Sequence, residues 1–259
     1  MKPCVFTGSA VAIVTPFCGD GVDLEAFDRL IKRQIQGGTD AIVVCGTTGE
    51  ASTMTDNEKL ALIAHTVQYC AGRCKVIAGT GTNDTAHSLQ LSRVAASMGA
   101  DAVLMVTPYY NKPTQEGLYR HFSTVADKVG LPVVLYNVPG RSGVPIAEAT
   151  VARLAKNPVI MAVKEAAGSV DRVSAILDLC DITVLSGDDS LTLPMMSVGA
   201  KGIISVSSNL IPGEMSAMVR AALEGDFAKA YAYHRKYYPF FRDQFVETNP
   251  IPIKAAMAM

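Results

Sequence analysis

Residues 159–164, VIMAVK in one-letter code, place five apolar residues in a row before a lysine. A strand with one face in water alternates apolar and polar residues, whereas a strand covered on both faces is apolar almost throughout. The stretch therefore predicts a strand buried on both sides, as in parallel sheets. Seven similar runs occur along the chain of 259 residues, at 10–15, 40–45, 75–79, 101–106, 132–136, 182–186 and 200–206.

An amphipathic stretch follows each of these runs. We expect helices at residues 23–36, 56–69, 85–98, 115–128, 146–155, 170–179, 190–197 and 212–223. Eight strand–helix units with short connections predict an α/β protein with a closed (β/α)8 TIM barrel.

An open, doubly wound sheet would produce the same local pattern. That fold calls for a glycine-rich phosphate loop after its first strand, but residues 14–17 (VTPF) contain no glycine. The later run Gly79-Thr80-Gly81 is half of a dinucleotide fingerprint, because Asp84 stands where the third glycine belongs. We therefore favour the barrel and expect no nucleotide site.

We divide the chain into a catalytic barrel at residues 1–224 and a C-terminal helical region at 225–259. The second region holds seven of the 17 Phe and Tyr residues, between Tyr231 and Phe245, at helical spacing. Such a face predicts packing against the core or against another subunit.

Composition excludes several classes of protein. Lys+Arg 23 against Asp+Glu 24 leaves a net charge of −1, so no basic surface for nucleic acid or an anionic membrane is expected. No apolar run approaches the roughly 18 residues of a membrane span. The N-terminus becomes polar at Thr7 to Ser9, too early for a signal peptide, and we expect a cytoplasmic protein.

Cysteines and histidines give no strong metal signal. The six cysteines form no CxxC pair, and Cys70 and Cys74, four residues apart, are a weak signal. None of the four histidines sits in HxH or HExxH spacing. We expect reduced, mostly buried thiols and no catalytic metal.

Lys164 is the most informative candidate for chemistry. In such a barrel, reactive groups lie at the C-terminal ends of the strands and in the loops that follow. Lys164 emerges there from an apolar run, and desolvation favours the neutral amine, which attacks a carbonyl to form an imine. The alternative is a lysine paired with Glu165 or with a phosphate.

Other polar side chains follow neighbouring strands. The hydroxyls of Tyr136, Tyr110 and Thr47 would pass protons, or the tyrosines would be rim aromatics. Thr47 and Thr48, flanked by glycines, suit a small carboxylate, or form a simple tight turn. Arg141 would clamp a second carboxylate, or be a solvated surface side chain.

Six motifs together carry a family resemblance. GTTGE at 46–50, PYYNKP at 108–113, YNVPGRSG at 136–143, VKEA at 163–166, SGDD at 186–189 and NPIPIK at 249–254 resemble the 4-hydroxy-tetrahydrodipicolinate synthase (dihydrodipicolinate synthase) family. The match runs in order from about residue 8 to residue 259.

The resemblance implies a lyase (EC 4.3.3.7) of the class I aldolase type. It would condense pyruvate with L-aspartate 4-semialdehyde in lysine and diaminopimelate biosynthesis, with no cofactor beyond an imine on Lys164. It also implies a homodimer or a homotetramer built as a dimer of dimers. Family members continue past the NPIPIK helix, so we expect an apparently shortened C-terminal region.

The resemblance assigns a role to each candidate. Lys164 is implied to form the Schiff base, and Tyr136 to relay protons through Thr47 to Tyr110, which reaches into a neighbouring subunit. Thr48 and the backbone of Ile204 would hold the pyruvate carboxylate. Gly187 would line the site, and Arg141 would bind the carboxylate of the semialdehyde.

Related functions remain open at this point. N-acetylneuraminate lyase and 2-keto-3-deoxy sugar acid aldolases share the GxTGE motif, the YN(V/I)P turn and the lysine. Arg141 in its GRSG context and the pair Tyr109-Tyr110 favour the synthase. A catalytically idle barrel is disfavoured because the whole candidate set is intact.

Lysine-inhibited family members use a pocket at the dimer interface. Asn83 and Tyr109 match that pocket, but its two histidine positions carry Asp56 and Lys59, and His87 replaces its glutamate. These replacements present the wrong charge to a lysine ammonium group, so weak or absent feedback inhibition is expected.

Overall fold

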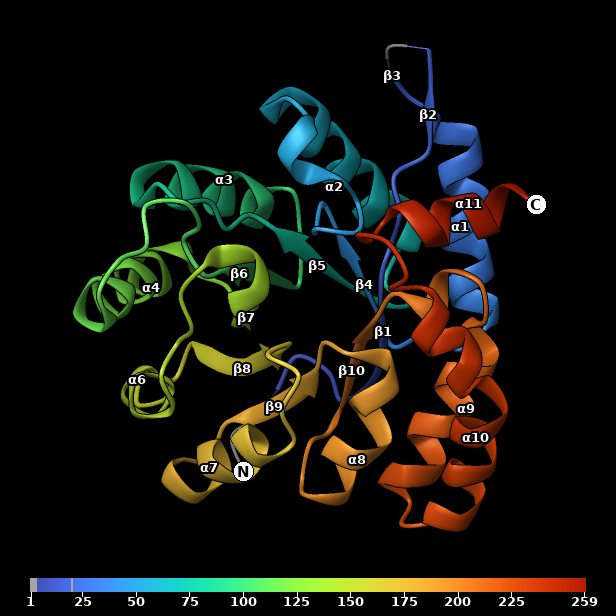
Figure 1. The fold of residues 1–259 in the computed structure, drawn as a ribbon. Coiled ribbons are helices and arrows are strands. Elements are labelled where there is room, and N and C mark those ends of the chain that lie inside the picture. The colour runs from blue at the N-terminus through green and yellow to red at the C-terminus, as the bar shows by residue number, and fades with distance from the viewer. Residues whose placement is uncertain (1–3, 20) are drawn as a thin grey trace.

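Eight parallel strands close into a barrel in the computed structural model, which describes residues 4–19 and 21–259 (Figure 1). The strands are β1 (Gly8–Ala12), β4 (Ala41–Val44), β5 (Lys75–Gly79), β6 (Ala102–Val106), β7 (Val133–Asn137), β8 (Ile160–Glu165), β9 (Thr183–Ser186) and β10 (Gly202–Ser205). Strand β1 pairs with both β4 and β10, which closes the sheet on itself. The predicted (β/α)8 barrel is confirmed.

Helices cover the outside of the barrel (Figure 1). They are α1 (Leu24–Gln36), α2 (Asp56–Cys70), α3 (Thr85–Ser97), α4 (Gln115–Val129), α6 (Glu148–Leu154), α7 (Asp171–Leu179), α8 (Thr192–Ser197) and α9 (Pro212–Leu223). Helix α2 begins with a capping box, in which Thr55 and Glu58 exchange hydrogen bonds. The helix bounds agree with those expected to within two residues.

The pleat of each strand decides which side chains face the interior. On β7, Val134 and Tyr136 belong to the inner cluster, whereas Leu135 packs outward against the helical layer. On β8, Ala162 is an inner residue and Val163 an outer one. Because side chains alternate with a period of two, Lys164 continues the inner face of β8.

Some elements were not predicted. A hairpin of β2 (Phe17–Cys18) and β3 (Gly21–Val22) and a one-turn helix α5 (Pro139–Ser142) are too short to show a hydrophobic period. The 3-10 turns are η1 (Ala51–Thr53), η2 (Asp189–Leu191) and η3 (Ser207–Asn209). Strand β1 begins at Gly8, before the apolar run at 10–15, because small residues make the first pairs with β10.

Two helices follow the eighth barrel unit. Helix α10 (Phe227–Asp243) packs on α9, and α11 (Ile251–Ala258) returns toward η3 (Figure 1). Ile253 of α11 is fully buried against Val14 and Val206, which follow β1 and β10. The end of the chain is therefore fixed at the C-terminal face of the barrel, where the candidate residues lie.

None of the helices in the described part of the chain is long and apolar enough to cross a membrane. Residues 1–3, on which the expectation of no signal peptide partly rests, lie outside the described residues.

Glycines make the seam between the first and last strands. Gly8 pairs with Gly202, and Gly202 has a φ of +148°. A Cβ on Gly202 would lie 2.0 Å from the carbonyl oxygen of Gly8, a distance that no packed structure tolerates. The two strands approach this closely because Gly202 carries no side chain.

Gly202→Ala is expected to lower the free energy of unfolding by about 3 kcal/mol, because the seam must open and the backbone is strained. Urea denaturation measures the change. Gly213→Ala is the matched control, since its Cβ meets nothing within 4 Å inside α9. That control is expected to be neutral or stabilising by about 0.5–1 kcal/mol. Equal midpoints for both variants would contradict the closure argument.

Candidate active site

Lys164 and Tyr136 are direct neighbours on the inner wall of the barrel. They are register partners on β8 and β7. The Nζ atom of Lys164 lies 4.2 Å from the centre of the Tyr136 ring. The two residues are only 5% and 6% exposed. The site therefore holds an amine and a phenol together, away from bulk water.

Glu165 does not pair with Lys164. Both of its carboxylate oxygens accept hydrogen bonds from Nδ2 of Asn137, at 2.9 Å, and Arg172 lies 3.4 Å away on the outer side. Burial raises the pKa of Glu165, while the Asn137 amide and the Arg172 guanidinium oppose that shift. This clamp joins the ends of β7 and β8 and leaves the lysine amine to the interior.

Gly187 lies directly against the lysine stem. Its amide donates to the carbonyl of Glu165 at 2.8 Å. A Cβ at this position would meet Ala166 at 2.6 Å and Cε of Lys164 at 3.0 Å. Glycine at this position therefore leaves room beside the Lys164 side chain.

Asp188 is a polar neighbour of Lys164 that sequence reasoning did not single out. Its carboxylate accepts a hydrogen bond from the amide of Gly168 at 3.2 Å. Burial raises the pKa of Asp188, and the positive charge of Lys164 opposes this shift. The SGDD motif marked the loop, but nothing in its spacing distinguished this carboxylate from the adjacent Asp189.

A cavity of about 360 Å³ opens at the C-terminal ends of β4 to β7. Thr47, Tyr136 and Arg141 all line it, so three of the predicted residues meet in one space. Tyr136 borders this cavity and also contacts Lys164, and it therefore connects the amine to the open mouth.

Tyr110 lies apart from the other hydroxyls. It is 90% exposed and has a φ of +71°. Among the described residues, no hydrogen bond joins the hydroxyls of Tyr110, Thr47 and Tyr136 to one another. Within a single chain the expected relay is therefore not assembled, and Tyr110 projects into solvent.

The remaining predicted binding residues are Thr48 and Ile204. Thr48 is 2% exposed in the turn after β4, where Cys45 and Glu50 both adopt positive φ. Ile204 is fully buried on the inner face of β10, in register with Ala10. Its side chain packs inside the barrel.

The C-terminal segment fastens two of these residues, a connection that sequence reasoning missed. Nδ2 of Asn249 donates to Oγ1 of Thr48 at 2.9 Å, and the carbonyl of Asn249 accepts from Nη2 of Arg141 at 2.9 Å. Lys254 ties the same segment to Glu50 at 2.5 Å. Asn249 is 201 residues from Thr48 in sequence, so no local pattern predicted the contact.

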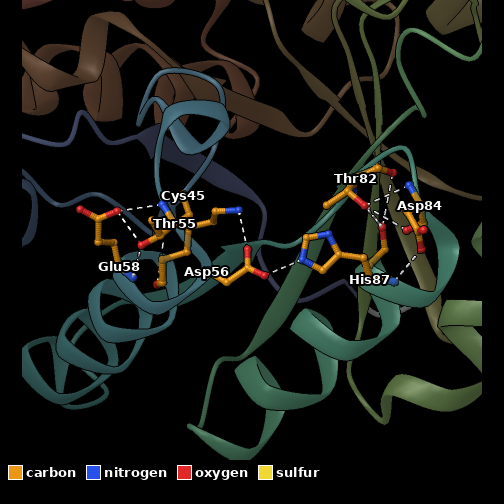
Figure 2. A network of polar contacts seen from close by, with 9 residues as sticks. Cys45, Thr55, Asp56, Glu58, Thr82, Asp84 and His87 are labelled. Atoms are coloured by element: carbon orange, nitrogen blue, oxygen red, sulfur yellow. Dashed lines mark hydrogen bonds and ion pairs between the residues drawn. The ribbon is translucent and has the colours of Figure 1, made fainter.

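A second polar group borders the same cavity. Asp56 accepts from Lys59 at 2.9 Å and lies 2.7 Å from Nε2 of His87. Both bonds lower the pKa of Asp56. Figure 2 shows this carboxylate bridging the first turns of α2 and α3, with His87 on α3 and Asp84 capping the start of that helix. Lys59, His87, Asn83 and Tyr109 all line the cavity.

Comparison with known proteins agrees with this arrangement. The family described as the Dihydrodipicolinate synthetase family matches residues 5–259. The 4-hydroxy-tetrahydrodipicolinate synthase of Pelobacter propionicus is 50% identical over 257 residues, covering 98% of this chain and 89% of the relative. That of Thermodesulfovibrio yellowstonii is 51% identical over 257 residues, covering 98% and 88%.

A solved structure gives the same result in three dimensions. The crystal structure of dihydrodipicolinate synthase from Aquifex aeolicus superimposes with a TM-score of 0.97 at 50% identity, over 98% of this chain and 88% of that one. With the barrel, the buried lysine and the full-length match in place, the chain belongs to the dihydrodipicolinate synthase family.

Proposed function

We propose that this chain is a lyase (EC 4.3.3.7) that condenses pyruvate with L-aspartate 4-semialdehyde to 4-hydroxy-tetrahydrodipicolinate, in lysine and diaminopimelate biosynthesis. The observation that carries the proposal is the buried amine of Lys164 beside the ring of Tyr136. Family membership supplies the reaction, and the geometry supports the part that each residue plays.

The reaction begins with imine formation. Nζ of Lys164 attacks the carbonyl carbon of pyruvate, and the carbinolamine loses water to give an iminium ion. That cation withdraws electrons, so the adjacent methyl group loses a proton and an enamine forms. Tyr136, whose ring lies beside Nζ, would carry protons at these steps through its hydroxyl group.

The enamine carbon then attacks the aldehyde of the semialdehyde, forming the new carbon–carbon bond. The amino group of that substrate adds to the imine carbon and displaces Lys164, which closes the ring and regenerates the enzyme. One water molecule is released for each pair of substrates. The proposal needs no metal or organic cofactor, since the covalent imine provides the electron sink.

Two carboxylates need separate partners. Thr48 and the backbone of Ile204 would hold the pyruvate carboxylate near Lys164. Arg141, at the mouth and held by Asn249, would bind the carboxylate of the second substrate. In this view the barrel at residues 1–224 carries the chemistry, and the region at 225–259 orients its entrance.

A second copy of the chain completes the proposed site. Tyr110 is exposed here and bonded to neither Tyr136 nor Thr47 among the described residues. A homodimer that brings the Tyr110 of one subunit to the site of the other would supply the missing hydroxyl, and a homotetramer would pair two such dimers. Both substrates are small metabolites, and we place the reaction in the cytoplasm.

Borohydride reduction tests the imine. With pyruvate present, the intact mass is expected to rise by one reduced pyruvate on Lys164. Lys164→Ala removes the adduct, and Lys128→Ala, on the exposed end of α4, is the matched control that retains it. An unmodified wild-type mass would favour an idle barrel.

The same preparation is then assayed with pyruvate and either aspartate 4-semialdehyde or N-acetylmannosamine. Turnover with the semialdehyde is expected. Turnover with N-acetylmannosamine alone would move the chain to the sialic acid lyases.

Arg141→Ala is expected to raise KM for the semialdehyde by about 10-fold to 100-fold, the range of a lost charge-assisted hydrogen bond. KM for pyruvate should change little, because Arg141 lies at the mouth rather than beside Lys164. Steady-state kinetics with each substrate varied in turn measure the split. Arg120→Ala, on the exposed face of α4, is the control. An equal rise in both KM values would contradict the assignment.

L-Lysine is expected to inhibit the chain weakly or not at all. Lys59 and His87 lie at the cavity wall where inhibited members place a histidine and a glutamate, and Asp56 is already engaged by both. The ammonium group of bound L-lysine would therefore meet the positive charge of Lys59, and the carboxylate of Asp56 would not be free to pair with it. Initial rates at increasing L-lysine measure the effect, and strong inhibition at low millimolar concentration would refute the expectation.

A further inference from the structure

The thiols of Cys70 and Cys74 lie close together. In the sequence, both residues are distant from Lys164. Cys70 is the last residue of α2, and Cys74 directly precedes β5. The two thiols are hydrogen-bonded, with their Sγ atoms 3.5 Å apart. The pair lies at the N-terminal end of β5, whereas the cavity opens at the C-terminal ends of the strands.

The turn between the two cysteines is what brings them together. Ala71 and Gly72 both adopt left-handed conformations, with φ of 46° and 76°, so the chain reverses directly after α2. The amide of Arg73 donates to the carbonyl of Cys70 at 2.9 Å and closes the turn. Gly72 allows this reversal because a glycine pays no steric penalty at positive φ.

Both sides of the turn are anchored. The Arg73 side chain donates through Nε to the carbonyl of Cys70 at 3.1 Å. Beyond Cys74, Asp101 bonds Nζ of Lys75 at 2.8 Å and the amide of Val76 at 2.9 Å. The two sulfur atoms are therefore held near each other by the backbone, and they must approach from 3.5 Å to about 2 Å to form a disulfide.

We propose that Cys70 and Cys74 are a thiol-oxidation site that a hydroperoxide converts into an intrachain disulfide. The Cys74 thiolate attacks one peroxide oxygen, the O–O bond breaks, and Cys74 becomes a sulfenic acid while hydroxide leaves. The Cys70 sulfur then attacks the sulfenic sulfur, loses its proton, and displaces the hydroxyl as water. Two thiols are oxidised and one peroxide is reduced.

Cys74 is the attacking residue of the two. It is 8% exposed, whereas Cys70 is 1% exposed, so Cys74 is the more accessible residue of the pair. The hydrogen bond with Cys70 holds the pKa of Cys74 below its usual range, and the Arg73 guanidinium acts in the same direction while burial opposes it.

Cys45 provides an internal contrast. Burial raises the pKa of Cys45 to about 12, and its Sγ donates to the carbonyl of Lys59 at 3.6 Å. A thiol held protonated in this way is a poor nucleophile, since the thiolate is the reactive form. Cys45 and Cys74 are both buried, but Cys74 differs in having a second thiol, that of Cys70, beside it.

Peptide mapping of the full-length wild-type chain tests the proposal. The reduced protein is treated with hydrogen peroxide, blocked with N-ethylmaleimide and digested with trypsin without reductant. Trypsin cuts after Lys59, Arg73 and Lys75 and so separates the two cysteines. A disulfide keeps peptide 60–73 joined to peptide 74–75, and dithiothreitol is expected to release them.

Variants separate the two steps. Cys70→Ser is expected to leave a sulfenic acid on Cys74 that dimedone captures, and Cys74→Ser to abolish the linked peptides. Cys180→Ser, which changes a half-buried cysteine elsewhere, is the matched control and retains the link. Maleimide on both Cys70 and Cys74 of the oxidised wild type, with oxidation confined to Cys18 or Cys4, would overturn the proposal. The peptide map of the wild-type chain tests the proposal by itself, so the test holds even if a serine variant folds poorly.

Discussion

The alternation of side chains across a closed barrel is the constraint on which the rest of this molecule depends. Because neighbouring residues of a strand face opposite sides, Lys164 points inward and Glu165 outward at the same strand end. The outward carboxylate is held by Asn137 and Arg172, and the inward amine meets Tyr136. A shift of β8 by one residue in its pairing register would turn Glu165 inward and Lys164 outward. A carboxylate would then stand beside Tyr136 in place of the amine.

The barrel alone does not complete the site. Asn249 reaches back from the end of the chain to bond Thr48 and Arg141, the proposed partners of the two substrate carboxylates. Burial of Ile253 between the ends of β1 and β10 fixes that segment in place. The C-terminal region therefore acts on the mouth of the barrel through a few specific contacts, although it contributes no strand.

Much of this arrangement was predictable from the sequence, for physical reasons. Continuous apolar runs mark strands buried on both faces, and the polar residues directly after them must meet at one end of a parallel barrel. That reasoning placed Lys164, Tyr136 and Arg141. Ile204 came only from the family resemblance, because a buried isoleucine on an inner strand carries no chemical signal.

The contacts that sequence reasoning missed are long-range or lack a pattern. Asn249 meets Thr48 only after the chain has closed the barrel, and the Gly8–Gly202 seam joins its opposite ends. The pairing of Cys70 with Cys74 depends on a left-handed turn at Ala71, where alanine gives no warning of positive φ.

A crystal structure of the chain soaked with pyruvate tests the central claim most directly. The account predicts density continuous from Nζ of Lys164 to the ligand, with the ligand carboxylate at Oγ1 of Thr48 and the backbone of Ile204. Pyruvate bound without a covalent link, with its carboxylate on Arg141 at the mouth, would contradict it.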